Sequence, residues 1–450
     1  MNPILNTDSY KFSHFLQYPP GTEFVSSYIE ARGCKRNWEQ MVMFGLAPFL
    51  KTLAQPITHG DIEEAAEIAK EHGVPFNRDG WEYILDKYKG KLPLEIWALP
   101  EGSVVDIGTP LVQVINLDKE VPWLTAFVET ALLRAVWYPV TVATQSWHIR
   151  KALLKAGYSR ENIPFALNDF GSRGVSSVES CAIGGAAHLV SFQGTDNLAA
   201  IDLLRKQYNA PMAGYSVIAA EHSTITSWGR ENEVDAYRNM LSLATPGSII
   251  SVVSDSYDIY NACTNLWGGE LKNEVMALRD IGARLVVRPD SGDPLLVPHK
   301  CVALLMEKFG YSTKDGYKIL PDYIRVLQGD GINEMSISHI LLVAKEMDLH
   351  PDNFVFGMGG AMLQGIDRDT LQFAMKTNAI RINGKWHDVY KDPVHGGKTS
   401  KRGRQAVIKG KAVRLEDMKV GDIDELRLVF YSGLYKRENY LDEIRERALK

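Results

Sequence analysis

Seven short turns from residue 168 onward in this 450-residue chain concentrate the residue types that carry out chemistry. They are Asn168-Asp169-Phe170-Gly171, Gly194-Thr195-Asp196, Glu221-His222-Ser223, Ser254-Asp255-Ser256, Arg288-Pro289-Asp290-Ser291-Gly292, Gly329-Asp330-Gly331 and Gly357-Met358-Gly359-Gly360. Asp, Ser and Gly are common turn and helix-capping residues, so any one of these turns has an ordinary structural explanation. Seven in succession, with Arg, His and Phe among them, indicate a composite site.

His222 and Asp255 are the candidate pair for proton transfer or nucleophilic chemistry, since they occupy successive turns. A carboxylate beside an imidazole orients the ring, so that the histidine can act as a base or as a nucleophile. A lone histidine is more often a hydrogen-bonded structural residue. The position of both residues at strand ends favours the functional interpretation.

Arg288 and Asp290 stand two residues apart, a spacing that places both side chains on the same side of a strand end. Together they could bridge a phosphate and the hydroxyl groups of a ribose, although a structural ion pair is the commoner outcome. Phe170 lies between Asp169 and Gly171, a position that suits stacking with a ligand. Core packing is the alternative for this ring.

The glycines after the last clear strand indicate phosphate binding. Gly359 and Gly360 would let backbone N–H groups approach an anion at the start of a helix, and barrel enzymes often bind phosphate after their last strands. A tight turn is the alternative, but Arg368 and Lys376 downstream supply the cations that phosphate prefers. The sequence contains no Walker motif and no GxGxxG motif, which disfavours the nucleotide-binding folds that carry them.

The elements that must position these turns are short strands alternating with helices. Apolar strand candidates recur at 163–167, 189–192, 213–217, 249–253, 284–287, 324–327 and 353–356. The intervals suit β/α units, because parallel strands need crossover connections. In an α/β barrel the carboxyl ends of the strands meet at one face, where the active site is built. The sequence therefore predicts an α/β barrel with its site at that face.

The first part of the chain has a different pattern of predicted secondary structure. Strand-like runs at 94–98 and 111–115 mix with helical stretches such as 61–72, and 122–156 reads as one or two long helices interrupted near Pro139. We expect an N-terminal α+β domain that includes dimer-contact segments, then the catalytic barrel, then a C-terminal segment that packs back on the N-terminal domain. The predicted ranges are 1–160, 161–380 and 381–450. The last includes a basic loop at 392–404, ordinarily a solvated surface, which here could close over a polyphosphate.

Composition limits the class of protein. The chain has 50 Lys+Arg against 55 Asp+Glu, a net charge of -5, with no bias that would indicate a nucleic-acid or membrane-surface binder. The four cysteines lie far apart, which argues against a disulfide scaffold or a structural zinc site and favours a reducing compartment. We find no signal peptide and no apolar run of about 18 residues, so we expect a cytoplasmic protein.

Eight stretches of the chain resemble the nicotinamide phosphoribosyltransferase family. They are Thr7-Asp8-Ser9-Tyr10-Lys11, Gln17-Tyr18-Pro19-Pro20, Asp169-Phe170-Gly171-Ser172-Arg173-Gly174-Val175-Ser176-Ser177, Gly194-Thr195-Asp196, Glu221-His222-Ser223-Thr224-Ile225-Thr226, Val253-Ser254-Asp255-Ser256-Tyr257-Asp258, Arg288-Pro289-Asp290-Ser291-Gly292 and Gln328-Gly329-Asp330-Gly331. The resemblance implies a type II phosphoribosyltransferase fold, an α/β barrel with a β-rich N-terminal domain, working as a homodimer. The implied reaction joins nicotinamide to 5-phosphoribosyl-1-pyrophosphate with Mg²⁺, giving nicotinamide mononucleotide and pyrophosphate.

The resemblance also implies how nicotinamide is held. The pyridine ring would stack between Phe170 and Tyr10 of the second subunit, and Asp196 would accept a hydrogen bond from the amide. A carboxylate attracts an amide donor and repels the carboxylate of nicotinate, so Asp196 should select the amide. Arg173 and Arg288 would hold the ring substituent and the phosphoribosyl phosphate.

The other roles implied by the resemblance concern the phosphoribosyl donor and ATP. ATP would activate the enzyme and be hydrolysed, with His222 phosphorylated beside Asp255, so that His222, Asp255 and Asp290 are the candidate catalytic residues. The resemblance assigns no Mg²⁺ ligand. The donor-binding residues would be Asp290, Gly329 and Asp330 for the ribose hydroxyls, Gly359 and Gly360 for the 5-phosphate, Arg368 and Lys376 for the anion sites, and Arg32, Lys391 and Lys398 for the pyrophosphate across the dimer.

The sequence departs from the family in places. Asn168 stands where vertebrate members carry a histidine, Ala361 replaces the third glycine of their glycine-rich run, and the segment 32–44 is shorter. Two alternatives stay open, a nicotinate phosphoribosyltransferase and a nicotinamide-binding protein without turnover. Asp196 argues against the first alternative. The joint presence of the catalytic candidates, Arg288 and the glycine turn argues against the second.

Overall fold

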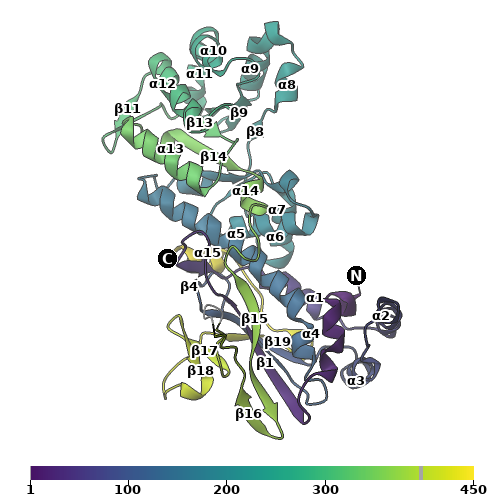
Figure 1. The fold of residues 1–450 in the computed structure, drawn as a ribbon. Coiled ribbons are helices and arrows are strands. Elements are labelled where there is room, and N and C mark those ends of the chain that lie inside the picture. Colours follow the sequence, from purple (N-terminus) through teal and green to yellow (C-terminus); the bar gives the residue numbers. More distant parts are fainter. Residues whose placement is uncertain (1, 395–398) are drawn as a thin grey trace. The chain divides into compact units, whose positions relative to one another are not determined.

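The computed structural model describes residues 2–394 and 399–450 and divides into two compact units. One, here the barrel unit, comprises Gln145–Arg205 and Pro211–Gly365. The other, here the mixed unit, comprises Met1–Thr144, Lys206–Ala210 and Ile366–Lys450. Within the described ranges, no helix is long and apolar enough to span a membrane. Figure 1 shows the elements of each unit along the chain.

The barrel unit is built on a seven-stranded parallel sheet with the order β7-β6-β14-β13-β10-β9-β8. An isolated parallel bridge between Gly194 and Tyr215 joins β7 to the segment that leads into β8. The two edges of the sheet therefore meet, as closure of a barrel requires. The strands are β6 (Leu167–Asp169), β7 (Gly194–Thr195), β8 (Ile218–Ala219), β9 (Ile249–Val253), β10 (Arg284–Arg288), β13 (Ile324–Gln328) and β14 (Phe354–Met358).

Helices connect successive strands of the barrel, as parallel pairing demands. Branched apolar residues fill β9, β10 and β13, and most of them are buried, which is typical of strands covered on both faces. The principal crossover helices are α6 (Val178–His188), α7 (Leu198–Gln207), α9 (Glu233–Ser242), α12 (Val297–Phe309) and α13 (Glu334–Glu346).

Three of the predicted strand positions were wrong. The run 163–167 begins as the 3-10 helix Ile163–Phe165, because Pro164 has no N–H to contribute to a strand ladder. The run 189–192 is the turn after α6, and the strand follows it at β7. The run 213–217 precedes β8 and contributes only the bridge at Tyr215. Short apolar runs do not distinguish a strand from its neighbours by periodicity alone.

The mixed unit contains an antiparallel sheet in which three N-terminal strands lie in the middle and C-terminal strands flank them on both sides. Its order is β16-β15-β1-β5-β3-β19-β20. Because β15 pairs with β1 along its whole length, 366–380 belongs to this unit, whereas the predicted boundary lay at 380. The strands are β1 (Thr22–Ala31), β3 (Leu94–Ala98), β5 (Pro110–Asn116), β15 (Phe373–Ile382), β16 (Lys385–Asp388), β19 (Arg427–Tyr431) and β20 (Leu434–Tyr435).

The predicted helix interruption at Pro139 was wrong. The chain forms α4 (Leu124–Phe127) and α5 (Glu129–Lys155), and Pro139 lies inside α5. Proline removes one hydrogen bond from a helix. Val136 and Val140 on either side are fully buried, and this packing outweighs the lost bond.

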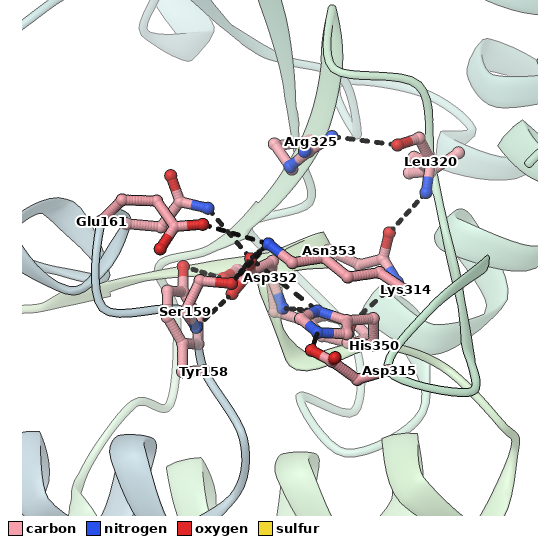
Figure 2. Close-up of polar contacts among 12 residues, drawn as sticks. Tyr158, Ser159, Glu161, Lys314, Asp315, Leu320, Arg325, His350, Asp352 and Asn353 are labelled. Atoms are coloured by element: carbon pink, nitrogen blue, oxygen red, sulfur yellow. Dashed lines mark hydrogen bonds and ion pairs between the residues drawn. The ribbon is translucent and has the colours of Figure 1, made fainter. Parts of the chain in front are cut away.

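Asp352 ties together loops at the amino-terminal ends of β6 and β14. Its buried carboxylate accepts hydrogen bonds from the backbone N–H of Ser159 at 2.9 Å, from Asn162 Nδ2 at 2.9 Å and from Lys314 Nζ at 3.1 Å. Figure 2 shows Ser159 and Lys314 converging on this carboxylate. Burial would raise the pKa of Asp352, but these hydrogen bonds hold it below its ordinary value. Lys314 comes from the hairpin of β11 (Ser312–Lys314) and β12 (Tyr317–Ile319).

Replacing this carboxylate should therefore destabilise the barrel unit. We expect Asp352→Ala to lower the free energy of unfolding by about 3 kcal/mol, because buried donors lose their acceptor. The matched control is Glu161→Ala, since Glu161 also contacts Lys314 but is 68% exposed, and it should leave the free energy of unfolding nearly unchanged. Because the folded pKa of Asp352 is lowered, the difference from wild type should shrink as pH falls below about 4. Urea unfolding at several pH values measures both effects, and equal losses in the two variants would contradict the account.

Candidate functional site

The carboxyl edge of the barrel gathers most of the predicted residues. Each strand ends immediately before a turn that carries at least one of them. The residues in these turns are Phe170 and Arg173 after β6, Asp196 after β7, His222 after β8, Asp255 after β9, Asp290 after β10, Gly329 and Asp330 after β13, and Gly359 and Gly360 after β14, with Arg288 the last residue of β10.

Phe170 presents a fixed aromatic surface. A Cβ at Gly357 would overlap its ring, so that glycine makes room for the ring rather than for an anion. The guanidinium of Arg288 lies 5.5 Å from the ring centroid, and the backbone N–H of Phe170 bonds to the carbonyl of Met358 at 3.0 Å. The side chain remains partly exposed. A planar ligand can therefore stack on a ring whose position is set by its neighbours.

Asp196 is an exposed carboxylate on the turn next to Phe170. Ser216 Oγ donates a hydrogen bond to Asp196 Oδ1 at 2.5 Å. This bond orients the carboxylate and does not involve its second oxygen, Oδ2. Ser216 also lines a cavity of about 650 Å³ inside the barrel unit, with Phe165, Asn168, Tyr215, Val286 and Leu327 among its other walls. An amide donor beside this cavity would find an oriented acceptor.

His222 and Asp255 form the predicted couple. His222 Nε2 lies 2.9 Å from Asp255 Oδ1, while Oδ2 of the same carboxylate accepts from Ser291 Oγ at 2.5 Å and from the backbone N–H of Asp290 at 3.0 Å. Burial would raise the pKa of Asp255, but these hydrogen bonds lower it, so the carboxylate is charged near neutral pH. The His222 side chain is 47% exposed. A charged, fixed partner on Nε2 directs the reactivity of the imidazole to Nδ1.

Arg288 and Asp290 form a partly exposed ion pair. Asp290 Oδ1 lies 2.7 Å from Nη2 and 3.2 Å from Nε of Arg288. A Cβ at Gly329 would lie 3.1 Å from Asp290 Oδ1, so a larger residue here would require the pair to shift by a few tenths of an ångström. The edge thus offers a cation and a hydroxyl acceptor side by side, the combination that the sequence predicted for phosphate and ribose.

The other predicted cations belong to the mixed unit. Lys376 on β15 lies opposite Tyr28 of β1. Burial lowers the pKa of Lys376; Glu129 opposes this shift, and Arg32, Lys11 and Lys391 add to it. These charges are therefore within electrostatic range of one another. Within the described residues, Arg32 Nε is buried and has no hydrogen-bond partner, which suits an incoming anion.

The remaining predictions in the mixed unit have different outcomes. Tyr10 is 57% exposed and packs edge-on against His14. Arg368 is exposed and pairs with its neighbour Asp369 at 3.2 Å, so nothing ties it to the Lys376 group. Lys398 lies outside the described residues. Across residues 2–394 and 399–450, no group of three or more His, Cys, Asp or Glu side chains is placed to hold a metal ion.

Three residues of the site were not predicted. Ser216 orients Asp196, Ser291 bonds to Asp255, and the buried Asn197 bonds to Asp169. Serine and asparagine in polar turns are common for structural reasons, so their types carry no distinguishing signal.

Comparisons with known proteins find relatives over nearly the whole chain. The model of the nicotinate phosphoribosyltransferase family matches residues 165–431, and the model of the nicotinamide phosphoribosyltransferase N-terminal domain matches residues 2–96. The chain is 49% identical to a nicotinamide phosphoribosyltransferase from Xanthomonas campestris, covering 99% of this chain and 98% of the relative. It is 33% identical to one from Acinetobacter baylyi, covering 99% and 97% of the two chains.

The fold also matches a solved structure. A nicotinate-nucleotide pyrophosphorylase from Pyrococcus furiosus aligns over 98% of this chain and 93% of its own length, with a TM-score of 0.61 and 17% sequence identity. Similarity at this identity concerns the fold alone. The predicted α/β barrel with a separate β-rich N-terminal domain is confirmed.

Proposed function

Because this chain belongs to the nicotinamide phosphoribosyltransferase family, we propose that it transfers the phosphoribosyl group of 5-phosphoribosyl-1-pyrophosphate to nicotinamide. The products are nicotinamide mononucleotide and pyrophosphate. The observation that carries the proposal is the placement of an aromatic surface, Phe170, and an oriented carboxylate, Asp196, on adjacent turns of the barrel edge. This combination recognises a flat ring that bears an amide.

The barrel residues divide the binding of the two substrates. Phe170 stacks on the pyridine ring, and Asp196 accepts the amide N–H. Arg288, held by Asp290, faces the ring and supplies a cation near the phosphoribosyl group. Arg173 is exposed and binds anionic oxygen. Asp290, Gly329 and Asp330 bind ribose hydroxyls, and backbone N–H groups at Gly359 and Gly360 bind the 5-phosphate.

The transfer breaks the bond between ribose C1 and the pyrophosphate oxygen and forms the bond from C1 to the pyridine nitrogen. The sugar passes through an oxocarbenium-like state, so stacking on Phe170 aids the reaction by holding the nitrogen in line with C1. In the homodimer proposed below, positive charge from Arg32 and Lys391 of the second copy stabilises the departing pyrophosphate. Mg²⁺ neutralises pyrophosphate charge when bound.

ATP is proposed to phosphorylate His222. The exposed ring, with Nε2 held by the charged Asp255, supports attack by Nδ1 on a γ-phosphate. A phosphohistidine would place negative charge at the barrel edge and couple ATP hydrolysis to substrate affinity.

We also propose a homodimer with shared active sites, in which Tyr10 of one copy stacks on the nicotinamide bound to Phe170 of the other. The exposure of Tyr10, 57% in the single chain, supports this role, because an exposed surface aromatic can cover a ring bound elsewhere.

Product formation tests the proposed function. The protein is given 5-phosphoribosyl-1-pyrophosphate and Mg²⁺ with either nicotinamide or nicotinate, with and without ATP. We expect nicotinamide mononucleotide to form preferentially and ATP to raise its yield. Turnover of nicotinate instead would make the protein a nicotinate phosphoribosyltransferase, and binding of nicotinamide without pyrophosphate release would make it a binding protein.

Asp196 should determine the choice between amide and acid. We expect Asp196→Asn to reduce the ratio of kcat/KM for nicotinamide over nicotinate by about tenfold or more, because the charge that repels nicotinate is removed; tenfold corresponds to about 1.4 kcal/mol. Asp280→Asn is the matched control, since Asp280 is an exposed carboxylate in the same unit that pairs only with its neighbour Arg279. An unchanged ratio in Asp196→Asn would sink this account of selectivity.

His222 should be required only for the use of ATP. We expect His222→Ala to abolish ATP hydrolysis and ATP stimulation while it keeps the ATP-independent transfer and the unfolding midpoint, because the side chain is half-exposed. Acid-labile phosphate on the protein, measured after incubation with γ-labelled ATP, should disappear with the variant. An ATP response that survives would refute the phosphohistidine role.

A further inference from the structure

The turns that carry Phe170 and Asp196 are joined through one buried carboxylate. Asp169 is fully buried at the end of β6. Its Oδ1 accepts from the backbone N–H of Gly171 at 2.7 Å, and its Oδ2 accepts from Asn197 Nδ2 at 3.0 Å. The first bond spans Phe170 and the second reaches the residue after Asp196. Asp169 therefore sets both the turn of the stacking ring and the turn of the selecting carboxylate.

Asn197 is held in a single orientation. Its Nδ2 also donates to the carbonyl of Cys181 at 2.9 Å, and its Oδ1 accepts from the backbone N–H of Ala200 at 3.1 Å and from the Cys181 thiol at 3.2 Å. Both amide hydrogens and both oxygen lone pairs are used, so a flipped amide would oppose every partner. The residue is 1% exposed, which makes each mismatch costly.

Helix α6 packs against the Asp169–Asn197 pair and also contacts the loop that carries Phe170. The thiol of Cys181 also lies 3.0 Å from Ser172 Oγ, and Ser172 precedes Arg173 in the loop that carries Phe170. A Cβ at Gly185 of the same helix would overlap Asn197 Nδ2 and lie 2.9 Å from Asp169 Oδ2. The helix thus packs against Asp169 and Asn197 without a side chain between them.

We propose that Asp169 and Asn197 are positioning residues that set the spacing between the nicotinamide-stacking ring of Phe170 and the amide-selecting carboxylate of Asp196. The proposal rests on the proposed function. Neither residue needs to touch the substrate, because each acts through the turn that it holds. Misplacement of a binding group by about 1 Å can cost a hundredfold in rate. Burial raises the pKa of Asp169 and Asp196 adds to this, while the bonds from Asn197 and Gly171 oppose it.

A role limited to fold stability is the rival explanation, and donor-acceptor matching separates the two. Asp169→Asn sets an amide N–H₂ against the donors of Gly171 or Asn197. Asn197→Asp sets a second carboxylate against Asp169. The reciprocal double variant restores the donor-acceptor match between positions 169 and 197, since the amide at 169 can accept from Gly171 and donate to the carboxylate at 197. The carboxylate at 197 cannot replace the bond that Asn197 Nδ2 donates to the Cys181 carbonyl, so the rescue is partial. Rescue by the double variant therefore reports the pairing itself.

The test measures kcat, the KM for each substrate and the ratio of kcat/KM for nicotinamide over nicotinate. We expect each single variant to raise the KM for nicotinamide about tenfold and to reduce the ratio, with the KM for 5-phosphoribosyl-1-pyrophosphate changed by less than about twofold. The double variant should recover a measurable part of both losses relative to either single variant. Asn162→Ala is the matched control, because it removes a comparable amide bond to the buried Asp352 of the same unit, and it should affect stability only.

Three results would overturn the proposal. They are single variants that behave like Asn162→Ala, single variants that raise both KM values equally, and a double variant that shows no recovery. If the single variants do not fold, Cys181→Ala removes the thiol bond to Asn197 without a new charge and should raise the KM for nicotinamide about threefold; an unchanged KM would contradict the proposal.

The failure of the proposed function has a different signature. If the wild-type protein releases no pyrophosphate but binds nicotinamide, the proposed reaction is wrong. The dissociation constants of the same variants, measured by calorimetry, then decide the positioning role. If the wild-type protein does not bind nicotinamide, both proposals fail.

Discussion

The backbone pairing between Tyr215 and the segment around Gly194 is the contact on which the arrangement of the barrel edge depends. The N–H of Tyr215 bonds to the carbonyl of Gln193 at 2.7 Å, and the N–H of Thr195 bonds to the carbonyl of Tyr215 at 3.0 Å. These two bonds join the edges of the sheet. They also place the next residue of each segment side by side, so that Ser216 reaches Asp196. Closure of the barrel and orientation of the Asp196 carboxylate are thus consequences of the same pairing.

Four carboxylates at this edge differ in function because their surroundings differ. Asp169 is buried, and its two oxygens accept hydrogen bonds from the backbone N–H of Gly171 and the side-chain amide of Asn197. Asp255 is almost buried and holds His222, while Asp290 is paired with Arg288. Asp196 is exposed and accepts a bond from one serine, so its second oxygen, which this bond does not involve, is accessible from outside. Carboxylates that lie close together can have different functions when each of them has its own hydrogen-bond or ion-pair partner.

Much of the barrel could be predicted because its strands are strongly patterned. The runs at β9, β10 and β13 are branched and apolar, and their predicted bounds agree with the structure to within one residue. The short strands β6, β7 and β8 were misplaced, since two or three paired residues leave no periodic signal. The turns were still recognised, because polar and glycine residues after a strand are local features. The pairing of His222 with Asp255 followed from the position of both residues at strand ends.

The sequence by itself determined the fold class, the identity of the edge residues and the family to which the chain belongs, because these depend on residue type and spacing. The tertiary structure alone decided which partners each residue has. Gly357 makes room for Phe170, and Gly185 makes room for Asn197. Ser216 bonds to Asp196. The members of each pair are not neighbours in the sequence, and no motif links them. A hydrogen bond or a close approach between distant residues depends on the path of the backbone in three dimensions. Local composition does not encode that path, so only the folded chain revealed how the site is held.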